Sequence, residues 1–377
     1  MKQFYPLSTF LTEYSEKNGV NAYRPVAVGR YGIRTRESIY SKELAKDYSK
    51  NKLIHKNTLT VGMGSVQIDI GVLTDDITYS VSPAYHTYKI AGVNAEYLRY
   101  CLECRNQDMF SRFVKRGSRQ GKTIDLKRWM TYEIPVYDEN RQQEIVDRLN
   151  RISELIEKRQ EQLVQLSELV KSRFIELFGV YPSNPKGWET ATIRDIVADV
   201  RYGSSRPAVD GGKYPYLRMN NITYGGELDL TDTKRIDIPD NELDKCTVRR
   251  GDVLFNRTNS KELVGKTCVY NRDEMMVLAG FVIRVRVTER VLPEFLSAFL
   301  NTDFSKQMLL GMCKAAIGQA NINAQEMQNI GIYLPPTELQ RQFVQFKEQT
   351  DKSKLAVQKG LQELEILKKS LMQQYFG

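Results

Sequence analysis

The chain has 377 residues, of which 41% are hydrophobic and 27% charged, so it is long enough to bury sizeable cores. Its 55 lysines and arginines against 46 acidic residues give a formal net charge of +9, which suits a polyanionic partner but is also compatible with an ordinary basic protein. No stretch approaches the roughly 20 apolar residues of a membrane-spanning helix, and no apolar signal core opens the sequence. We therefore expect a soluble, cytoplasmic protein.

Five cysteines are scattered along the sequence, at Cys101, Cys104, Cys246, Cys268 and Cys313. An odd number of cysteines without a secretion signal does not indicate a disulfide framework. Cys101 and Cys104 have the spacing of a metal-binding pair, but no second pair and no nearby histidine completes a set of four ligands. We expect buried structural thiols, and neither a metal nor a cofactor held by this chain.

The first part of the sequence favours a mixed α/β domain. The stretch Leu53–Ile90 is rich in Val, Ile, Thr and Tyr with glycine punctuation, which predicts strands. A helix is predicted over Ala95–Phe113. The glycine-broken basic loop Val114–Lys122 follows, and a short strand is predicted at Tyr132–Val136.

A long helix is predicted over Asp138–Gly179. Its apolar residues recur at spacings of four and three, the pattern of a coiled-coil seam, and Arg159 and Arg173 interrupt it. Solvated edge positions are the favoured interpretation of these two arginines, and contacts to a partner helix or subunit are the alternative. The following segment, Val180–Trp188, has the Pro, Gly and Asn content of a linker.

The second half of the chain repeats the first. Thr247–Tyr270 aligns with Leu53–Asp76 at an offset of 194 residues, which places Gly265 on Gly71. Glu338–Gly377 aligns with the central helix at an offset of 198 residues, with identical residues along its length. A tandem duplication of one plan, a mixed α/β domain followed by a long helix, explains both alignments.

The duplication predicts an α+β fold with two mixed α/β domains in tandem, at residues 1–137 and 180–337. The long helices, at residues 138–179 and 338–377, are predicted to pair as an antiparallel coiled coil. A helix of about 40 residues is roughly 60 Å long, so such a pair would be a rigid spacer. The residues expected in helix pairing or partner docking are Ile145, Leu149, Ile152, Ile156, Leu163, Leu166, Val170, Val357, Leu361, Leu364 and Leu371.

No active site is recognisable in the sequence. Two Gly-Lys-Thr triplets begin at Gly121 and Gly265, but a P-loop needs a glycine five positions earlier, where this chain has Arg116 and Ser260. Motifs for amino-group methylation and nuclease endings are missing, and two histidines give little material for a catalytic triad. The sequence therefore favours binding over catalysis.

Basic and amide-rich loops differ between the two halves, whereas the scaffold positions are shared. Arginine suits guanine, asparagine and glutamine suit adenine, and lysine, serine and threonine suit phosphate, so these loops predict two DNA-reading surfaces. For any single residue a solvated turn is an equally good interpretation. The candidates in the first half are Arg34, Arg36, Ser65, Gln67, Arg116, Arg119, Gln120 and Lys122. Those in the second half are Ser204, Ser205, Arg206, Arg218, Asn220, Asn221, Asn256, Arg257, Asn259, Lys261, Gln319 and Asn321.

Short motifs recur in a fixed order along the chain. Those of the second half are Lys186–Trp188, Tyr214–Arg218, Arg250–Leu254, Gly318–Ile322 and Leu334–Pro336. Together with Tyr79–Tyr85 and Glu133–Pro135 of the first half, they resemble the specificity subunits of Type I restriction–modification systems over essentially the full length. The first half departs from the pattern, because it lacks a Gly-Trp start and no Arg-Gly-Asp-Val counterpart precedes Leu59.

The resemblance implies a non-catalytic subunit that reads a bipartite, asymmetric site in double-stranded DNA through two target recognition domains, with the helices as a ruler. It implies two methyltransferase subunits as partners, which use S-adenosylmethionine to methylate adenine. Through them it implies restriction subunits, which use ATP and Mg. The alternatives are a self-sufficient DNA-modifying enzyme and a coiled-coil scaffold that does not bind DNA specifically.

Overall fold

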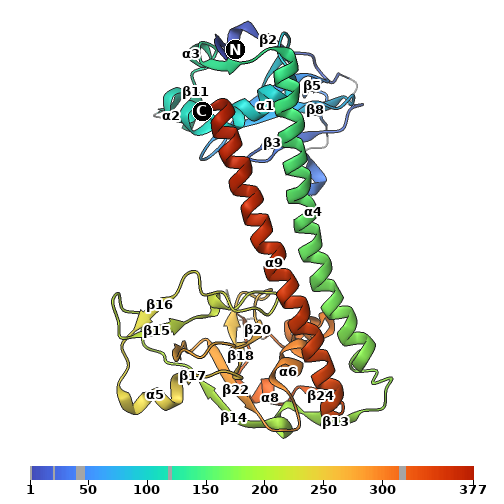
Figure 1. Ribbon diagram of the computed structural model, residues 1–377, viewed down its shortest axis with the longest axis vertical. Helices are drawn as coiled ribbons and strands as arrows, with labels where there is room; N and C mark the ends of the chain where they lie inside the picture. Colours follow the sequence, from blue (N-terminus) through green and yellow to red (C-terminus); the bar gives the residue numbers. More distant parts are fainter. Residues whose placement is uncertain (1, 20–21, 40–46, 118–120, 314–319) are drawn as a thin grey trace. The chain divides into compact units, whose positions relative to one another are not determined.

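The computed structural model describes residues 2–19, 22–39, 47–117, 121–313 and 320–377, except for the side chains of residues 116 and 117. The chain divides into two compact units, Met1–Gln160 with Gln358–Gly377 (unit 1) and Glu161–Val357 (unit 2). Two long helices, α4 (Glu139–Phe178) and α9 (Thr337–Phe376), each contribute to both units (Figure 1). No helix in the described ranges is long and apolar enough to cross a membrane.

Unit 1 is built on an antiparallel sheet in the order β2-β9-β6-β7. One face packs on the helices, and the β3–β4 hairpin packs on the other, where Gly71 leaves room for Val28 and Ile33. A Cβ atom on Gly71 would lie 2.6 Å from Ile33 and 2.9 Å from Val28. The strands are β1 (Gln3–Pro6), β2 (Leu11–Tyr14), β3 (Val26–Gly29), β4 (Gly32–Thr35), β5 (Lys52–Ile54), β6 (Thr58–Met63), β7 (Ile68–Leu73), β8 (Tyr79–Val81), β9 (His86–Ile90), β10 (Val114–Gly117), β11 (Gly121–Ile124) and β12 (Glu133–Val136). The helices are η1 (Leu7–Thr9), η2 (Arg36–Ser38), α1 (Ala95–Cys104), α2 (Asn106–Phe113) and α3 (Leu126–Trp129).

Unit 2 has a sheet of the same order, β14-β22-β18-β20, and a second sheet, β16-β15-β21-β17. Its strands are β13 (Glu189–Thr192), β14 (Val197–Tyr202), β15 (Tyr214–Leu217), β16 (Lys234–Ile236), β17 (Thr247–Val248), β18 (Val253–Asn256), β19 (Thr258–Asn259), β20 (Thr267–Val269), β21 (Met276–Leu278), β22 (Val282–Val287), β23 (Ala320–Asn321) and β24 (Gly331–Leu334). Its helices are η3 (Ile193–Ile196), η4 (Met219–Asn221), α5 (Asp240–Cys246), α6 (Pro293–Leu300), α7 (Asp303–Met312) and α8 (Ala324–Gln328). The predicted α+β plan of two mixed domains and two long helices is confirmed.

The strand ladders correct one detail of the repeat. Gly71 pairs with Thr60, and the equivalent pair in unit 2 is Cys268 with Leu254. The prediction that Gly265 matches Gly71 was therefore wrong. The offset is 194 residues between Thr60 and Leu254 but 197 between Gly71 and Cys268. The chain between the two paired residues is therefore three residues longer in unit 2 than in unit 1, and an alignment without a gap does not accommodate this.

The turn formed by Arg249–Asp252 in unit 2 has a structural counterpart in the first half, although the Arg-Gly-Asp-Val letters are missing there. Asn57 and Gly251 occupy equivalent turns with positive φ angles of 59° and 90°. The hydroxyl of Thr58 accepts a hydrogen bond from the backbone N–H three residues earlier (3.1 Å), as the carboxylate of Asp252 does in unit 2 (2.9 Å). Asparagine adopts the left-handed conformation more readily than most residues, so a different sequence before Leu59 forms the same turn.

Each domain is fastened to the start of the helix that follows it by one buried glutamine. In unit 1 the Gln142 side chain accepts from the backbone N–H of Asn94 (2.9 Å) and donates to the carbonyl of Tyr137 (2.7 Å). Gln340 does the same in unit 2, with Leu292 (2.8 Å) and Pro335 (2.9 Å). Each residue lies 198 positions after its counterpart.

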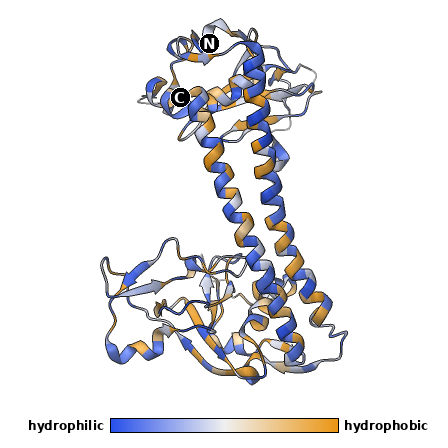
Figure 2. Cartoon of the chain, in the orientation of Figure 1, coloured by the Kyte–Doolittle hydropathy of each residue, from blue (hydrophilic) through white to orange (hydrophobic). Residues whose placement is uncertain are grey.

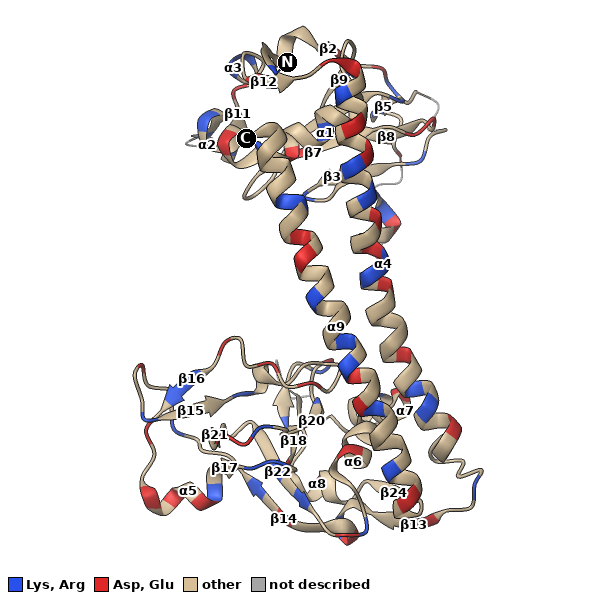
Figure 3. Ribbon diagram, viewed as in Figure 1, with Lys and Arg blue, Asp and Glu red and all other residues tan. Residues whose placement is uncertain are grey.

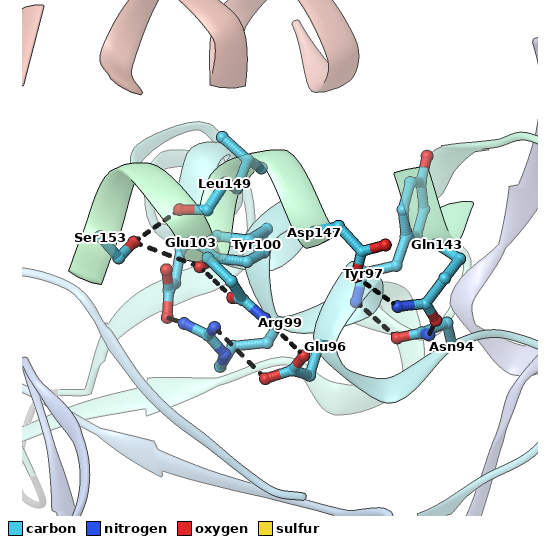
Figure 4. A network of polar contacts seen from close by, with 11 residues as sticks. Asn94, Glu96, Tyr97, Arg99, Tyr100, Glu103, Gln143, Asp147, Leu149 and Ser153 are labelled. Carbon is cyan, nitrogen blue, oxygen red and sulfur yellow. Dashed lines mark hydrogen bonds and ion pairs between the residues drawn. The ribbon is translucent and has the colours of Figure 1, made fainter. Parts of the chain in front are cut away.

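Around this junction, α1 and α4 share a polar network in unit 1 (Figure 4). The Tyr100 hydroxyl donates to Asn150 (2.7 Å), whose amide donates to Glu96 (2.9 Å). Asn94 caps α1 by accepting from the N–H of Tyr97 (3.0 Å), and its amide donates to Gln143 (3.1 Å). Polar contacts therefore fix the angle at which α4 leaves the domain.

The ends of the long helices are also equivalent, but each completes the core of the other repeat's domain. Phe376, at the end of α9, lies 5.1 Å from Tyr97 between ring centroids in the core of unit 1. Phe178, at the end of α4, lies 4.8 Å from Phe295 in the core of unit 2. In each unit the start of one long helix therefore packs beside the end of the other, which is the predicted antiparallel pairing.

The predicted seam residues line the helices with graded burial. Ile145, Leu149, Ile152 and Val357 are buried, and the remaining seven are half-buried: Ile156, Leu163, Leu166, Val170, Leu361, Leu364 and Leu371. Figure 2 shows apolar residues recurring along both helices. The Arg173 guanidinium lies 5.7 Å from the centre of the Phe346 ring in α9, so this arginine contacts the partner helix rather than only solvent.

Candidate nucleic-acid interface

In unit 2 the polar candidates gather where β18 ends. Asn256 is fully buried, and its amide nitrogen donates to the carbonyls of Thr258 (3.0 Å) and Phe281 (3.1 Å). Its oxygen accepts from the Asn259 amide (2.9 Å). Both ends of the Asn256 side chain are therefore used inside the protein, and it shapes the turn from which its neighbours project.

Arg257 follows directly and is half-buried. Its guanidinium lies 4.8 Å from the ring centre of Tyr202, an exposed residue at the end of β14. The Tyr202 hydroxyl accepts from the backbone N–H of Ala324 (2.9 Å), which ties the ring to α8. An aromatic face favours arginine by a cation–π interaction, so Arg257 is held before any ligand arrives.

The short β19–β23 pair brings Asn321 beside this arginine. The Asn321 side chain accepts from the Thr258 hydroxyl (2.8 Å), and the backbone of Asn259 pairs with Ala320. Phe281, which is 51% exposed, accepts from the backbone N–H of Arg257 through its carbonyl (3.0 Å). The structure therefore gathers Arg257, Asn259 and Asn321. It adds Tyr202 and Phe281, which sequence reasoning missed because a lone aromatic carries no recognisable pattern.

A second group lies on the sheet β16-β15-β21-β17 and is largely committed to the fold. Arg206 forms a bidentate ion pair with Glu242 (2.6 and 3.2 Å), and this hydrogen bonding raises the pKa of Arg206. Arg218 pairs with Asp232 (2.9 Å). Among the other candidates here, Ser204 and Asn221 are buried, and Ser205 and Asn220 are exposed.

Asn221 illustrates a structural use of a candidate reader. Its amide donates to the carbonyls of Asp229 (2.8 Å) and Asp232 (3.1 Å), and its oxygen accepts from the N–H of Arg218 (2.8 Å). An amide with every one of these bonds satisfied gains nothing by turning towards a base. Figure 3 shows basic residues on β16, with acidic residues on α5.

Unit 1 gathers a different set. The Lys122 ammonium on β11 donates to the carbonyl of Ser65 in the β6–β7 turn, and it lies 5.3 Å from the Phe110 ring centre. The Gln67 carbonyl closes the same turn by accepting from Gly64 (3.1 Å). The structure therefore joins Ser65, Gln67 and Lys122 across two hairpins that are distant in sequence.

Arg34 and Arg36 form a separate group around β4. The Arg34 guanidinium lies 4.5 Å from the ring centre of Tyr31, and that of Arg36 lies 5.0 Å from that of Tyr48. Lys261, in unit 2, is exposed on the connection after β19. Arg119, Gln120, Gln319 and the side chain of Arg116 lie outside the described part of the chain.

The cysteines lack the features of a reactive or metal-binding set. Cys101 is fully buried, and burial raises the pKa of its thiol to about 12. Burial raises the pKa of Cys104 as well. Within the ranges that the structure covers, no three His, Cys, Asp or Glu side chains are grouped as metal ligands.

The family profile described as "Type I restriction modification DNA specificity domain" matches residues 11–166 and 185–366. Among curated proteins, the putative type I restriction enzyme MjaX specificity subunit of Methanocaldococcus jannaschii is 27% identical over 196 residues, covering 51% of this chain and 46% of that protein. The type I restriction enzyme EcoKI specificity subunit of Escherichia coli is 25% identical over 188 residues, covering 49% of this chain and 40% of that protein. Both alignments span less than half of the relative's length.

Two solved structures share the fold along the whole chain. The S subunit of a Type I restriction–modification system from M. genitalium covers 100% of this chain and 96% of its own, with a TM-score of 0.56 and 14% identity. A structure titled for complex assembly and conformational transition of a type I system covers 99% and 97%, with a TM-score of 0.60 and 17% identity. At these identities the likeness concerns the fold.

Proposed function

Because the chain belongs to the family of Type I restriction–modification DNA specificity domains, matched over both of its halves, we propose that it reads a bipartite, asymmetric DNA site. Each target recognition domain, at residues 1–137 and 180–337, reads one half of the site. The helices at residues 138–179 and 338–377 act as the spacer between the half-sites. The chain itself carries out no chemistry and directs adenine methylation and restriction by its partners.

The observation that supports this proposal best is that the two units share a scaffold but carry different polar residues at the ends of their equivalent strands. Both units have one strand order, one glutamine junction and one helix-end packing. Yet unit 2 presents Arg257 against Tyr202 where β18 ends, whereas unit 1 presents Lys122 and Ser65 beside β6. Two domains with the same backbone arrangement but different polar side chains suit a DNA site whose two halves differ in sequence.

The partners follow from the same proposal. Two methyltransferase subunits, which carry S-adenosylmethionine, bind the chain, and restriction subunits that use ATP and Mg join through them. The basic net charge of +9 suits the DNA partner.

Sequencing of methylated adenine tests the proposal. Cells that carry the cognate methyltransferase with this chain are compared with cells in which the chain is deleted. We expect methylation at one bipartite motif that disappears with the deletion. Methylation at no bipartite motif, or methylation that persists without the chain, would refute the proposal. Binding of S-adenosylmethionine by the isolated chain would instead favour a self-sufficient enzyme.

A further inference from the structure

A cavity of about 460 Å³ lies in unit 2. Its walls come from both long helices, from the junction of α6 and α7, and from the loop Thr223–Glu227. Phe174 and Phe343 supply part of an apolar floor. The volume is within the range of small-molecule sites, which are commonly apolar with a few directed polar groups.

The loop over this cavity is closely fitted to the domain. Gly226 has a positive φ of 84°, and a Cβ atom there would lie 2.5 Å from the Asn301 amide nitrogen and 2.9 Å from the Thr267 carbonyl oxygen. A side chain at this position would therefore push the loop away from Asn301, at the end of α6, and from β20. Glycine keeps the neighbouring Tyr224 over the cavity.

Charged side chains surround the cavity, and most are paired. Three lysines have carboxylate partners: Lys171 with Glu168 (2.9 Å) and Asp303 (3.7 Å), Lys354 with Glu227 (3.4 Å) and Asp351 (4.0 Å), and Lys347 with Asp351. These three lysines therefore face four carboxylates, Glu168, Glu227, Asp303 and Asp351, which leaves one negative charge in excess. They leave a fourth lysine of the lining to be explained.

That fourth lysine, Lys306 on α7, has no carboxylate partner among the described residues. Its ammonium contacts the Gly265 carbonyl (3.5 Å) and lies 4.8 Å from the Tyr224 ring centre. Burial, followed by the like charge of Lys266, lowers the pKa of Lys306 to about 8. Lys306 is half-buried. A partly desolvated ammonium without a counter-ion lowers the stability of the folded protein, so an anion that enters the cavity would relieve this penalty.

We propose that this cavity binds the phosphate group of a nucleotide, with Lys306 as its counter-ion. The volume exceeds what a bare phosphate fills, and the Tyr224 ring together with the apolar floor accepts the base or sugar beside it. The phosphate comes either from a free mononucleotide or from the backbone of bound DNA. The first source is independent of the DNA-reading function, and the second rests on it.

Equilibrium dialysis of the full chain with labelled AMP tests the first source. Wild type and the variants Lys306→Met and Lys352→Met are compared, because Lys352 is exposed on α9 and outside the cavity lining. We expect binding to weaken at least about tenfold in K306M, the scale of a lost charge-assisted hydrogen bond, and to be unchanged in K352M. Thermal unfolding of both variants verifies that they are folded.

The salt dependence of binding to the methylated motif's duplex tests the second source. If a DNA phosphate occupies the cavity, the slope of log K against log salt becomes less steep by about one in K306M. In that case the duplex also competes with AMP, or AMP does not bind even without the duplex. AMP binding that persists on the duplex identifies a free nucleotide as the ligand. Equal AMP binding and equal salt slopes in K306M and wild type would overturn the proposal. The AMP measurement does not depend on whether methylation follows a bipartite motif, whereas the duplex measurement rests on the proposed function. A failure of the proposed function therefore leaves the AMP result standing, and the two proposals can fail separately.

Discussion

A single buried amide can join a domain to a helix. Gln142 is 5% exposed and Gln340 is fully buried, and each satisfies two backbone groups that would otherwise lack a partner. The cost of leaving such groups unsatisfied exceeds the benefit of making the bonds. At the residue scale, a substitution that removes either amide should therefore destabilise its unit.

Gln340→Leu should destabilise unit 2 by about 2–5 kcal/mol, because it leaves the Leu292 N–H and the Pro335 carbonyl buried and unpaired. Urea unfolding monitored by fluorescence would measure this loss. The control is Gln345→Leu, at an exposed position of the same helix, which should change stability little. Equal effects of the two substitutions would contradict the junction role.

Arg257→Ala should relax recognition of one half-site only, by about 1–3 kcal/mol for each bidentate pair of hydrogen bonds to a base that it removes. The Tyr202 ring holds this guanidinium, so the substitution removes a prepared donor rather than a mobile one. Binding to duplexes randomised in either half-site would measure the change. Arg34→Ala, in unit 1, should affect the other half. A similar loss at both halves in either variant would speak against two independent readers.

Lys306 should give stability a dependence on alkaline pH. Its pKa is about 8 in the folded protein, below its ordinary value of 10.5, so between these pH values the unfolded chain holds a proton that the folded chain does not. Stability should therefore rise with pH across this window, by up to about 3 kcal/mol from this group. Below pH 8 the penalty is fully present. Lys306→Met should abolish this component of the rise in urea titrations, with Lys352→Met as the control; identical pH profiles would contradict it.

At the scale of elements, the long helices could be predicted from the sequence, because the local spacing of apolar residues determines them. The heptad spacing indicated the first long helix, and the 198-residue repeat indicated the second one and their pairing. The β20 register was mispredicted because a longer connection shifts Cys268, not Gly265, into the place of Gly71. Loop length is set by a few residues without a pattern, so sequence spacing alone does not reveal it.

The candidate site was predicted in composition but not in detail. Arg257 was expected among the readers, and the structure places it at a prepared position. Asn256 and Asn221 also lie in polar segments and were predicted as readers, yet their amides form hydrogen bonds inside the protein. Only tertiary contacts distinguish a buried structural amide from an exposed one, since both occur in the same kind of polar loop. The Tyr202 contact depends on β14, more than 50 residues earlier in the chain.

The spacer proposal concerns the whole molecule. Removing one heptad from each long helix, such as residues 155–161 of α4 and 359–365 of α9, preserves the seam spacing and shortens each helix by about 10 Å. We expect the methylated motif to lose about three base pairs between its halves, or binding to be lost. Methylation sequencing measures the spacing. An unchanged spacing would show that these helices do not set the distance between half-sites.

Unit 1 is assembled from the first 160 residues and from residues 358–377, with Tyr375 and Phe376 in its core. On the ribosome, the whole of unit 2 is therefore made before the last part of the first core exists. Until then, the first core lacks Phe376, whose ring packs on Tyr97 in the finished unit. A product of premature termination thus lacks a finished first domain as well as the missing segment, and is exposed to proteolysis in both places. The first domain can therefore be completed only after Phe376 has been synthesised.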